Sequence, residues 1–107
     1  MTTAKPVDAA ALAARIMTFA ADPASGMMPA QKRILNALAG PLCGMTHVSP
    51  SGLVVAWGEA QTRVIREDID AGVRGDSIPT ETRAATLREL VAALCDEDFA
   101  DAVEAAQ

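Results

Sequence analysis

Hydrophobic residues near the N-terminus recur at helical spacing. Leu12, Ile16 and Phe19 are separated by four and then three residues, which places them on one stripe of a helix. Asp8 lies just before this stripe and has the short carboxylate that suits a helix N-cap. An Asp-Pro pair would stop the helix, so the pattern predicts a helix over residues 8–21.

A second helical pattern comes after residues 24–28, which are expected to form a flexible link. Pro29 occupies the first helical position, where proline is favoured. Three apolar residues would give this helix its buried face: Ile34, Leu35 and Leu38. Gly40 and Pro41 disfavour its continuation, so we expect a helix over residues 29–39.

Residues 41–57 allow two interpretations, of which we favour a long helix. Ser49 would cap this helix, Pro50 would be its first residue, and it would continue to Ala71, where Gly72 stops it. Seven residues would form one broad apolar face: Leu53, Val54, Trp57, Ala60, Val64, Ile65 and Ile69.

The alternative is a short β-hairpin over residues 45–57. Residues 49–52 would then form a turn that joins the extended segments 45–48 and 53–57, and the helix would begin near Gly58. Two i,i+4 pairs of opposite charge would stabilise the helical part that both interpretations share: Glu59 with Arg63, and Arg66 with Asp70.

The C-terminal part carries the clearest amphipathic pattern. Thr80 is placed to cap a helix over residues 81–95. Four apolar residues would line one side of this helix: Leu87, Leu90, Val91 and Leu94. Asp96 would cap a short last helix with an acidic first turn, in which Phe99 and Val103 face inward.

These elements predict an all-α fold, a small four- or five-helix orthogonal bundle. It would form one domain over residues 1–107, with residues 1–7 flexible. Hydrophobic residues make up 50% of the chain, but many are alanines and only 3% of all residues are aromatic. Alanine favours helix but contributes little buried apolar area, so we expect stability to depend partly on self-association.

The formal net charge is −5, and acidic residues gather at the C-terminal end. Because phosphate binding needs a concentrated positive surface, general affinity for nucleic acid is not expected. The two cysteines form no CxxC pair, so we expect reduced thiols. Residues 9–21 are apolar enough to suggest a signal peptide, but the charges of Asp8 and Arg15 interrupt its hydrophobic region. The longest run of large apolar residues is Leu53–Trp57, too short for a membrane helix, so we expect a cytoplasmic location without a membrane partner. The preference for alanine, and for arginine over lysine, suggests a bacterial or phage origin.

Residues that could carry chemistry are few. His47 is the only histidine, and Cys43 lies four residues before it without a third group to orient the pair. With Met45 and Cys95 these residues offer soft metal ligands, but a structural zinc site normally takes four Cys or His ligands. The carboxylates of residues 67–70 are interpreted as a solvated helix end. We therefore predict no enzyme activity, no catalytic residue, no metal site and no cofactor.

One stretch resembles the helix-turn-helix family of DNA-binding proteins. A helix over Pro29–Ala39 would be followed by the apolar-Ser-x-x sequence that begins at Val48 and opens a recognition helix. The family's turn glycine is replaced by His47. Four residues would face the DNA groove, and none is basic: Ser49, Ser51, Val54 and Val55. The resemblance implies either a degenerate helix-turn-helix transcriptional regulator or a form of the fold that no longer binds DNA.

The consecutive apolar residues at the start of the long helix predict an interface. Leu53, Val54, Val55 and Trp57 extend beyond one helical face, so a single core would not cover all four. The expected function is therefore a small helical protein-interaction module, an adaptor, regulator or inhibitor of another protein, which also forms a homodimer. Besides the transcriptional regulator, the second alternative is an oligomer that binds a small ligand at subunit junctions.

Overall fold

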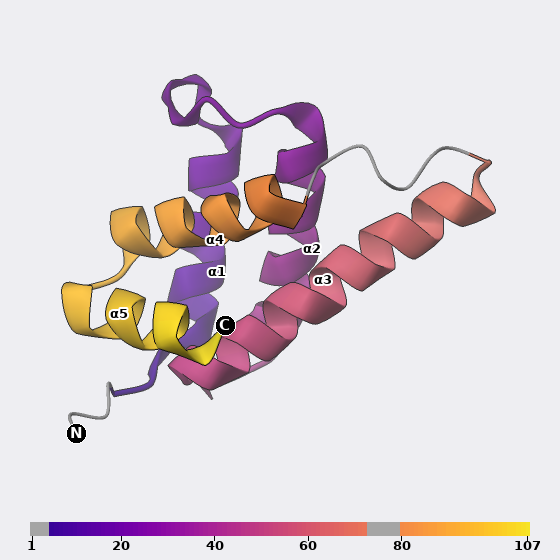
Figure 1. The fold of residues 1–107 in the computed structure, drawn as a ribbon. Helices are drawn as coiled ribbons and strands as arrows, with labels where there is room; N and C mark the ends of the chain where they lie inside the picture. The colour runs from indigo at the N-terminus through magenta and orange to yellow at the C-terminus, as the bar shows by residue number, and fades with distance from the viewer. Residues whose placement is uncertain (1–4, 73–79) are drawn as a thin grey trace.

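The computed structural model describes residues 5–72 and 80–107, and it contains five α-helices in that part of the chain (Figure 1). The elements in chain order are β1 (Val7–Asp8), α1 (Ala9–Ala21), a 3-10 turn η1 (Pro23–Ser25), α2 (Pro29–Cys43), β2 (His47–Val48), α3 (Pro50–Asp70), α4 (Thr80–Leu94) and α5 (Glu97–Ala106). This architecture confirms the predicted small all-α bundle.

Helices α1 and α2 lie side by side and form the most extensive helix pair (Figure 1). Helices α4 and α5 run crosswise to this pair, and α5 also packs against α3. The long helix α3 lies against α2, and its C-terminal part extends away from the other helices (Figure 1). The molecule is therefore elongated, with principal extents of 45 × 26 × 26 Å.

The core is built from the apolar stripes that the sequence predicted. Helix α1 contributes Leu12 and Ile16, which are almost fully buried. The other helices contribute the predicted inward residues Ile34, Leu35, Leu38, Leu87, Leu90, Val91, Phe99 and Val103, all of which are buried. Several small residues fill the spaces between helices: Ala9, Ala13, Ala20, Ala39, Ala56 and Ala60. Because alanine side chains are short, neighbouring helices can pack closely without large side chains between them.

Three of the predicted N-caps are present. The carboxylate of Asp8 accepts a hydrogen bond from the Ala11 amide at 3.1 Å. The hydroxyl of Ser49 accepts one from Gly52 N–H, and the carboxylate of Asp96 accepts one from the Phe99 amide. Each cap satisfies an amide that has no partner within its own helix. Helix α4 already includes Thr80 as its first residue, and the loop before it lies outside the described residues.

Helix α2 is longer than predicted, because Gly40 and Pro41 do not end it. The helix continues to Cys43 with Pro41 inside its last turn. A proline ring clashes with the Cβ of the preceding residue in a helix, and Gly40 has no Cβ. The additional turn also buries Leu42 completely, which favours helix over an earlier stop.

The link between α1 and α2 is more ordered than the predicted flexible segment. Residues 23–25 form η1, and the side chain of Asp22 accepts a hydrogen bond from the Ala24 amide. Gly26 has a φ of 68°, a left-handed conformation that glycine adopts without a Cβ clash. The next residue, Met27, is then directed into the core, where its exposed fraction is 7%.

The long helix is the correct interpretation for residues 50–70. Ser49 caps α3 and Pro50 is its first residue, as predicted. The extended segment His47–Val48 is present too, but it pairs antiparallel with Val7–Asp8 and not with residues 53–57. Within the segment expected to be flexible, Val7 therefore belongs to β1, while residues 1–4 lie outside the described part of the chain.

Candidate functional site

The four predicted interface residues lie in different environments on α3. Leu53 and Trp57 are buried, with exposed fractions of 0% and 4%, and belong to the chain's own core. Val54 is partly buried and packs against that core, whereas Val55 is 61% exposed. The reason is helical geometry, since each residue turns the helix by about 100°. Val55 therefore points almost opposite to Leu53 and Trp57, and only it remains fully available to a partner.

Five exposed residues share the direction of Val55 and define what we call the outward face of α3. They are Val55, Glu59, Thr62, Arg66 and Ile69. At about 100° per residue, these positions lie within roughly 40° of one direction, and the first, third and last are spaced seven residues apart. The exposed fraction of Ile69 is 64%, although the sequence placed this residue on the buried side. The outward face thus carries an exposed aliphatic residue at each end and charged residues between them.

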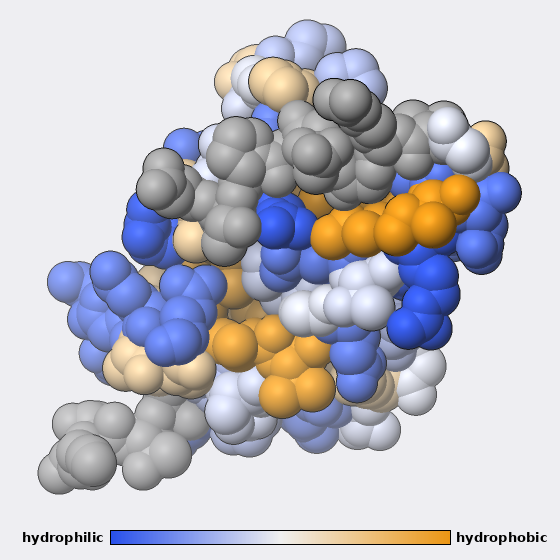
Figure 2. Space-filling model, turned by 45° about the vertical axis from the view of Figure 1, so that its right-hand side comes forward, coloured by the Kyte–Doolittle hydropathy of each residue, from blue (hydrophilic) through white to orange (hydrophobic). Residues whose placement is uncertain are grey.

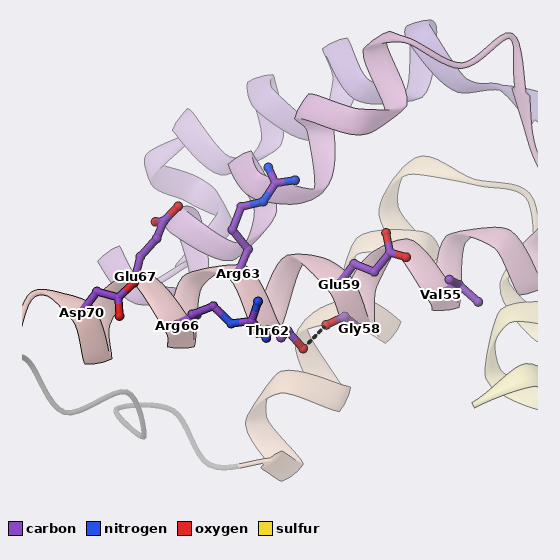
Figure 3. A pocket seen from close by; sticks show the side chains of 8 residues that line it. All are labelled: Val55, Gly58, Glu59, Thr62, Arg63, Arg66, Glu67 and Asp70. Atoms are coloured by element: carbon purple, nitrogen blue, oxygen red, sulfur yellow. Dashed lines mark hydrogen bonds between the residues drawn. The ribbon is translucent and has the colours of Figure 1, made fainter.

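An open groove of about 640 Å³ runs along this part of α3. Eight described residues line it: Val55, Gly58, Glu59, Thr62, Arg63, Arg66, Glu67 and Asp70 (Figure 3). The hydroxyl of Thr62 donates a hydrogen bond to the Gly58 carbonyl at 2.9 Å, which turns its polar atom toward its own helix. Gly58 presents no side chain, and nothing lies within 4 Å of the position its Cβ would occupy. Near the middle of the helix the groove is therefore open at Gly58, where no side chain fills it.

The charged residues of this groove make few contacts with the rest of the molecule. The predicted pairs Glu59 with Arg63 and Arg66 with Asp70 do not come within ion-pair distance in the described structure. These side chains remain in solvent, where each keeps its hydration and its freedom to reorient. The outward face consequently offers charges of both signs that nothing in the described residues of this chain neutralises at short range.

The other side of α3 near its C-terminal end is held by an ion pair that the sequence did not predict. Arg33 of α2 donates a hydrogen bond to the Asp68 carboxylate at 2.7 Å, and its second terminal nitrogen lies 3.8 Å from Glu67. Asp68 is 8% exposed, which corrects the interpretation of the carboxylates here as a solvated helix end for this residue, while Glu67 and Asp70 are exposed as predicted. It faces the core side of α3, where a carboxylate needs a partner, and Arg33 reaches it from a position 35 residues away.

A second polar link joins α2 to α4. The side-chain oxygen of Gln31 accepts a hydrogen bond from the Met28 amide, and its nitrogen donates to the Thr86 hydroxyl at 2.8 Å. Thr86 in turn donates to the Thr82 carbonyl, so this buried hydroxyl has both a donor and an acceptor partner. Gln31 therefore caps the start of α2 and fixes α4 across it.

The residues considered for catalysis and metal binding do not assemble into a site. Cys43, Met45 and His47 are exposed around the connection between α2 and α3. Within residues 5–72 and 80–107, no group of three or more His, Cys, Asp or Glu side chains could hold a metal ion. Met45 has an exposed fraction of 42%, so this connection is solvated and does not form a closed ligand cage.

Cys95 is half-buried at the end of α4, beside a cavity of about 320 Å³ between α4 and α5. Burial raises the pKa of its thiol, while Arg15 opposes this shift and Asp96 adds to it. A raised pKa keeps the sulfur in the thiol form near neutral pH, and the thiol is a poor nucleophile and metal ligand. Cys95 therefore lacks the environment of a reactive cysteine.

The stretch that resembles a helix-turn-helix has a different connection. Residues 44–49 separate α2 from α3 and include β2, whereas the motif joins its helices by a turn of about three or four residues. The four groove-facing candidates are also not equivalent, because Ser49 is the N-cap of α3 and Val54 is partly buried. Of the four, Ser51 and Val55 are exposed, and neither can bind phosphate through a positive charge.

Comparisons with known proteins define no class for this fold and surface: no protein-family model, curated protein or solved structure matches the chain. In the part of the chain that the structure describes, no helix is both long enough and apolar enough to span a membrane.

Proposed function

We propose that this protein is a small helical interaction module that binds another protein molecule through the outward face of α3. The observation that carries the proposal is the pair of exposed aliphatic side chains, Val55 and Ile69, one at each end of that face. Among the large hydrophobic residues that the structure describes, these two have the highest exposed fractions, 61% and 64%. Such side chains gain free energy when a partner removes them from water.

The arrangement around these residues supports protein contact over small-molecule chemistry. The groove along α3 is open to solvent, and charged side chains line most of it. Enclosed, mainly apolar pockets are typical of small-ligand sites, whereas mixed polar and apolar surfaces are typical of non-obligate protein interfaces. On one side of the molecule, hydrophobic side chains lie in two separate areas with hydrophilic ones beside them (Figure 2).

The proposal keeps the predicted character of the protein as an adaptor, regulator or inhibitor and not an enzyme. It also keeps the cytoplasmic location, for which the unpaired cysteines are the support. Of the four predicted interface residues, Val55 would contact the partner. Leu53 and Trp57 would hold α3 in place from its core side.

The test compares two substitutions of exposed aliphatic residues, one on the outward face and one outside it. Val55→Asp should abolish binding, because a carboxylate at the contact would be desolvated without a partner. Met17→Asp is the matched control, since Met17 is 44% exposed and lies on α1, outside the outward face of α3. Binding would be followed by light scattering after size exclusion and by affinity capture with the tagged protein.

Circular dichroism would show that both variants keep their helices. Loss of assembly or capture in Val55→Asp alone supports the proposal. The proposal is wrong if the wild-type protein stays monomeric at high concentration and if every protein that it captures is also captured by Val55→Asp.

A further inference from the structure

We infer that the partner of the outward face is a second copy of this chain, bound with its α3 antiparallel about a two-fold axis near Thr62. The inference rests on the proposed function, because it uses the same face and names its occupant. The carrying observation is the order of side chains along the face, which is aliphatic, acidic, small, basic and aliphatic: Val55, Glu59, Thr62, Arg66 and Ile69.

This order complements itself when it is reversed. In an antiparallel pair centred near Thr62, Glu59 of one copy lies at the level of Arg66 of the other, and the same contact repeats across the axis. Val55 then lies at the level of Ile69 of the other copy. Helical rise is about 1.5 Å per residue, so both matches hold within about one residue. Two ion pairs and two aliphatic contacts therefore form at once, as a two-fold interface requires.

A parallel arrangement would not have this property. It would place Glu59 against Glu59 and Arg66 against Arg66, and like charges in contact oppose association. The middle of the face also favours close approach of the antiparallel pair. Gly58 lacks a side chain, and Thr62 directs its hydroxyl to the Gly58 carbonyl, so its methyl group is left for the partner helix.

The absence of intrachain ion pairs on this face supports the same arrangement. Glu59 and Arg66 have no ion-pair partner among the described residues, although each has an oppositely charged residue four positions away. Both are therefore free to meet a charge on the second copy. Helix α3 also extends beyond the other helices at its C-terminal end (Figure 1).

Charge reversal provides the decisive experiment, with the association constant measured by sedimentation equilibrium. Glu59→Arg and Arg66→Glu should each weaken dimerisation at least tenfold, because each places two like-charged pairs in the interface. The double variant Glu59→Arg/Arg66→Glu restores opposite charges across the axis and should recover most of the wild-type affinity.

Matched controls are Glu104→Arg on α5 and Arg15→Glu on α1, both exposed positions outside the outward face. These variants should dimerise as the wild type does. If the double variant is no better than the single ones, or if the controls weaken dimerisation equally, the inference is wrong.

Disulfide cross-linking locates the axis independently. In a Cys43→Ser background, Thr62→Cys should form a covalent dimer under mild oxidation, because the two residues 62 would face each other across the axis. Thr18→Cys, exposed on α1, should not cross-link efficiently. Efficient dimerisation of the residue 18 variant, or none for the residue 62 variant, would contradict the arrangement.

The outcomes separate this inference from the function on which it rests. A wild-type monomer that captures a different protein, and loses it in Val55→Asp, would disprove self-pairing and leave the interaction module intact. A wild-type monomer without such a partner would disprove both.

Discussion

The two halves of α3 are held in the molecule by different kinds of contact. The first half is anchored by hydrophobic burial, since Leu53, Ala56, Trp57 and Ala60 are all less than 8% exposed. In the second half, Val64 is the last buried apolar residue, and the final turn depends on the ion pair between Arg33 and Asp68. Added salt does not screen hydrophobic burial, whereas it weakens a half-exposed ion pair by screening.

Because the two halves are held differently, the two ends of the outward face are anchored differently. Its Val55 end lies on a helix segment fixed by the core, while its Ile69 end lies beyond the buried Val64, next to the ion pair of Arg33 with Asp68. A rigid end would lose little conformational freedom on binding, and a weakly anchored end would lose more. The first half of α3 should therefore dominate the stability of the domain, and the second half should control the geometry of the far end of the face.

Substitution in the first half should have the largest effect. Trp57→Ala should lower the free energy of unfolding by roughly 3–5 kcal/mol, because it removes a buried aromatic side chain and leaves a cavity. Urea denaturation followed by circular dichroism would measure the change. An effect below about 1 kcal/mol would show that Trp57 contributes little to the core, and its burial would then need another explanation.

Breaking the ion pair should have a smaller effect, and the effect should depend on which partner is removed. Arg33→Ala leaves the Asp68 carboxylate buried without its donor and should cost roughly 1–3 kcal/mol. Asp68→Ala should cost less, because Arg33 is 47% exposed and water can solvate it. Glu67→Ala is the control and should cost under about 0.5 kcal/mol, since that contact is 3.8 Å long and solvent-exposed.

Hydrogen exchange would show where the loss occurs. In Arg33→Ala, amides in the last two turns of α3 should exchange faster, while those near Trp57 should keep their protection. Equal acceleration along all of α3 would mean that the two halves unfold together and that the comparison between them does not hold.

The smallest effect on stability is expected at the far end of the outward face. Ile69→Ala should change the free energy of unfolding by less than about 0.5 kcal/mol, because its side chain is 64% exposed. The same substitution should weaken association measurably if this residue contacts a partner. A stability loss above about 1 kcal/mol would place Ile69 in the folded core and remove it from the outward face.

Much of the fold follows from local signals in the sequence. The caps at Asp8, Ser49 and Asp96 need only a short polar side chain followed by free amides, so sequence spacing was sufficient to find them. The buried stripes were found for the same reason, because the helical repeat decides which residues share a face. Pro41 was misjudged, since the general rule against proline in helices does not weigh the burial of Leu42 beyond it.

The predicted interface residues stay a prediction, and the structure adds only their exposure. Of the four residues Leu53, Val54, Val55 and Trp57, Val55 alone has a largely exposed side chain. The helical repeat alone could have separated Val55 from Leu53 and Trp57. The same repeat places Ile69 within about 40° of Val55, so it too could have been separated from Trp57, although its i,i+4 spacing from Ile65 makes it look like a continuation of the apolar stripe.

The sequence by itself determined the helices, most of their ends and the direction in which each residue points from its own helix axis, because these depend on neighbours within a few positions. Only the tertiary structure decided which part of the broad apolar side of α3 would be covered. That depends on where α2 and α5 pack, and on Arg33 reaching Asp68 across 35 residues. Contacts between residues so far apart in the sequence leave no periodic pattern in it. Which side of α3 stays exposed could therefore be seen only in the packed helices.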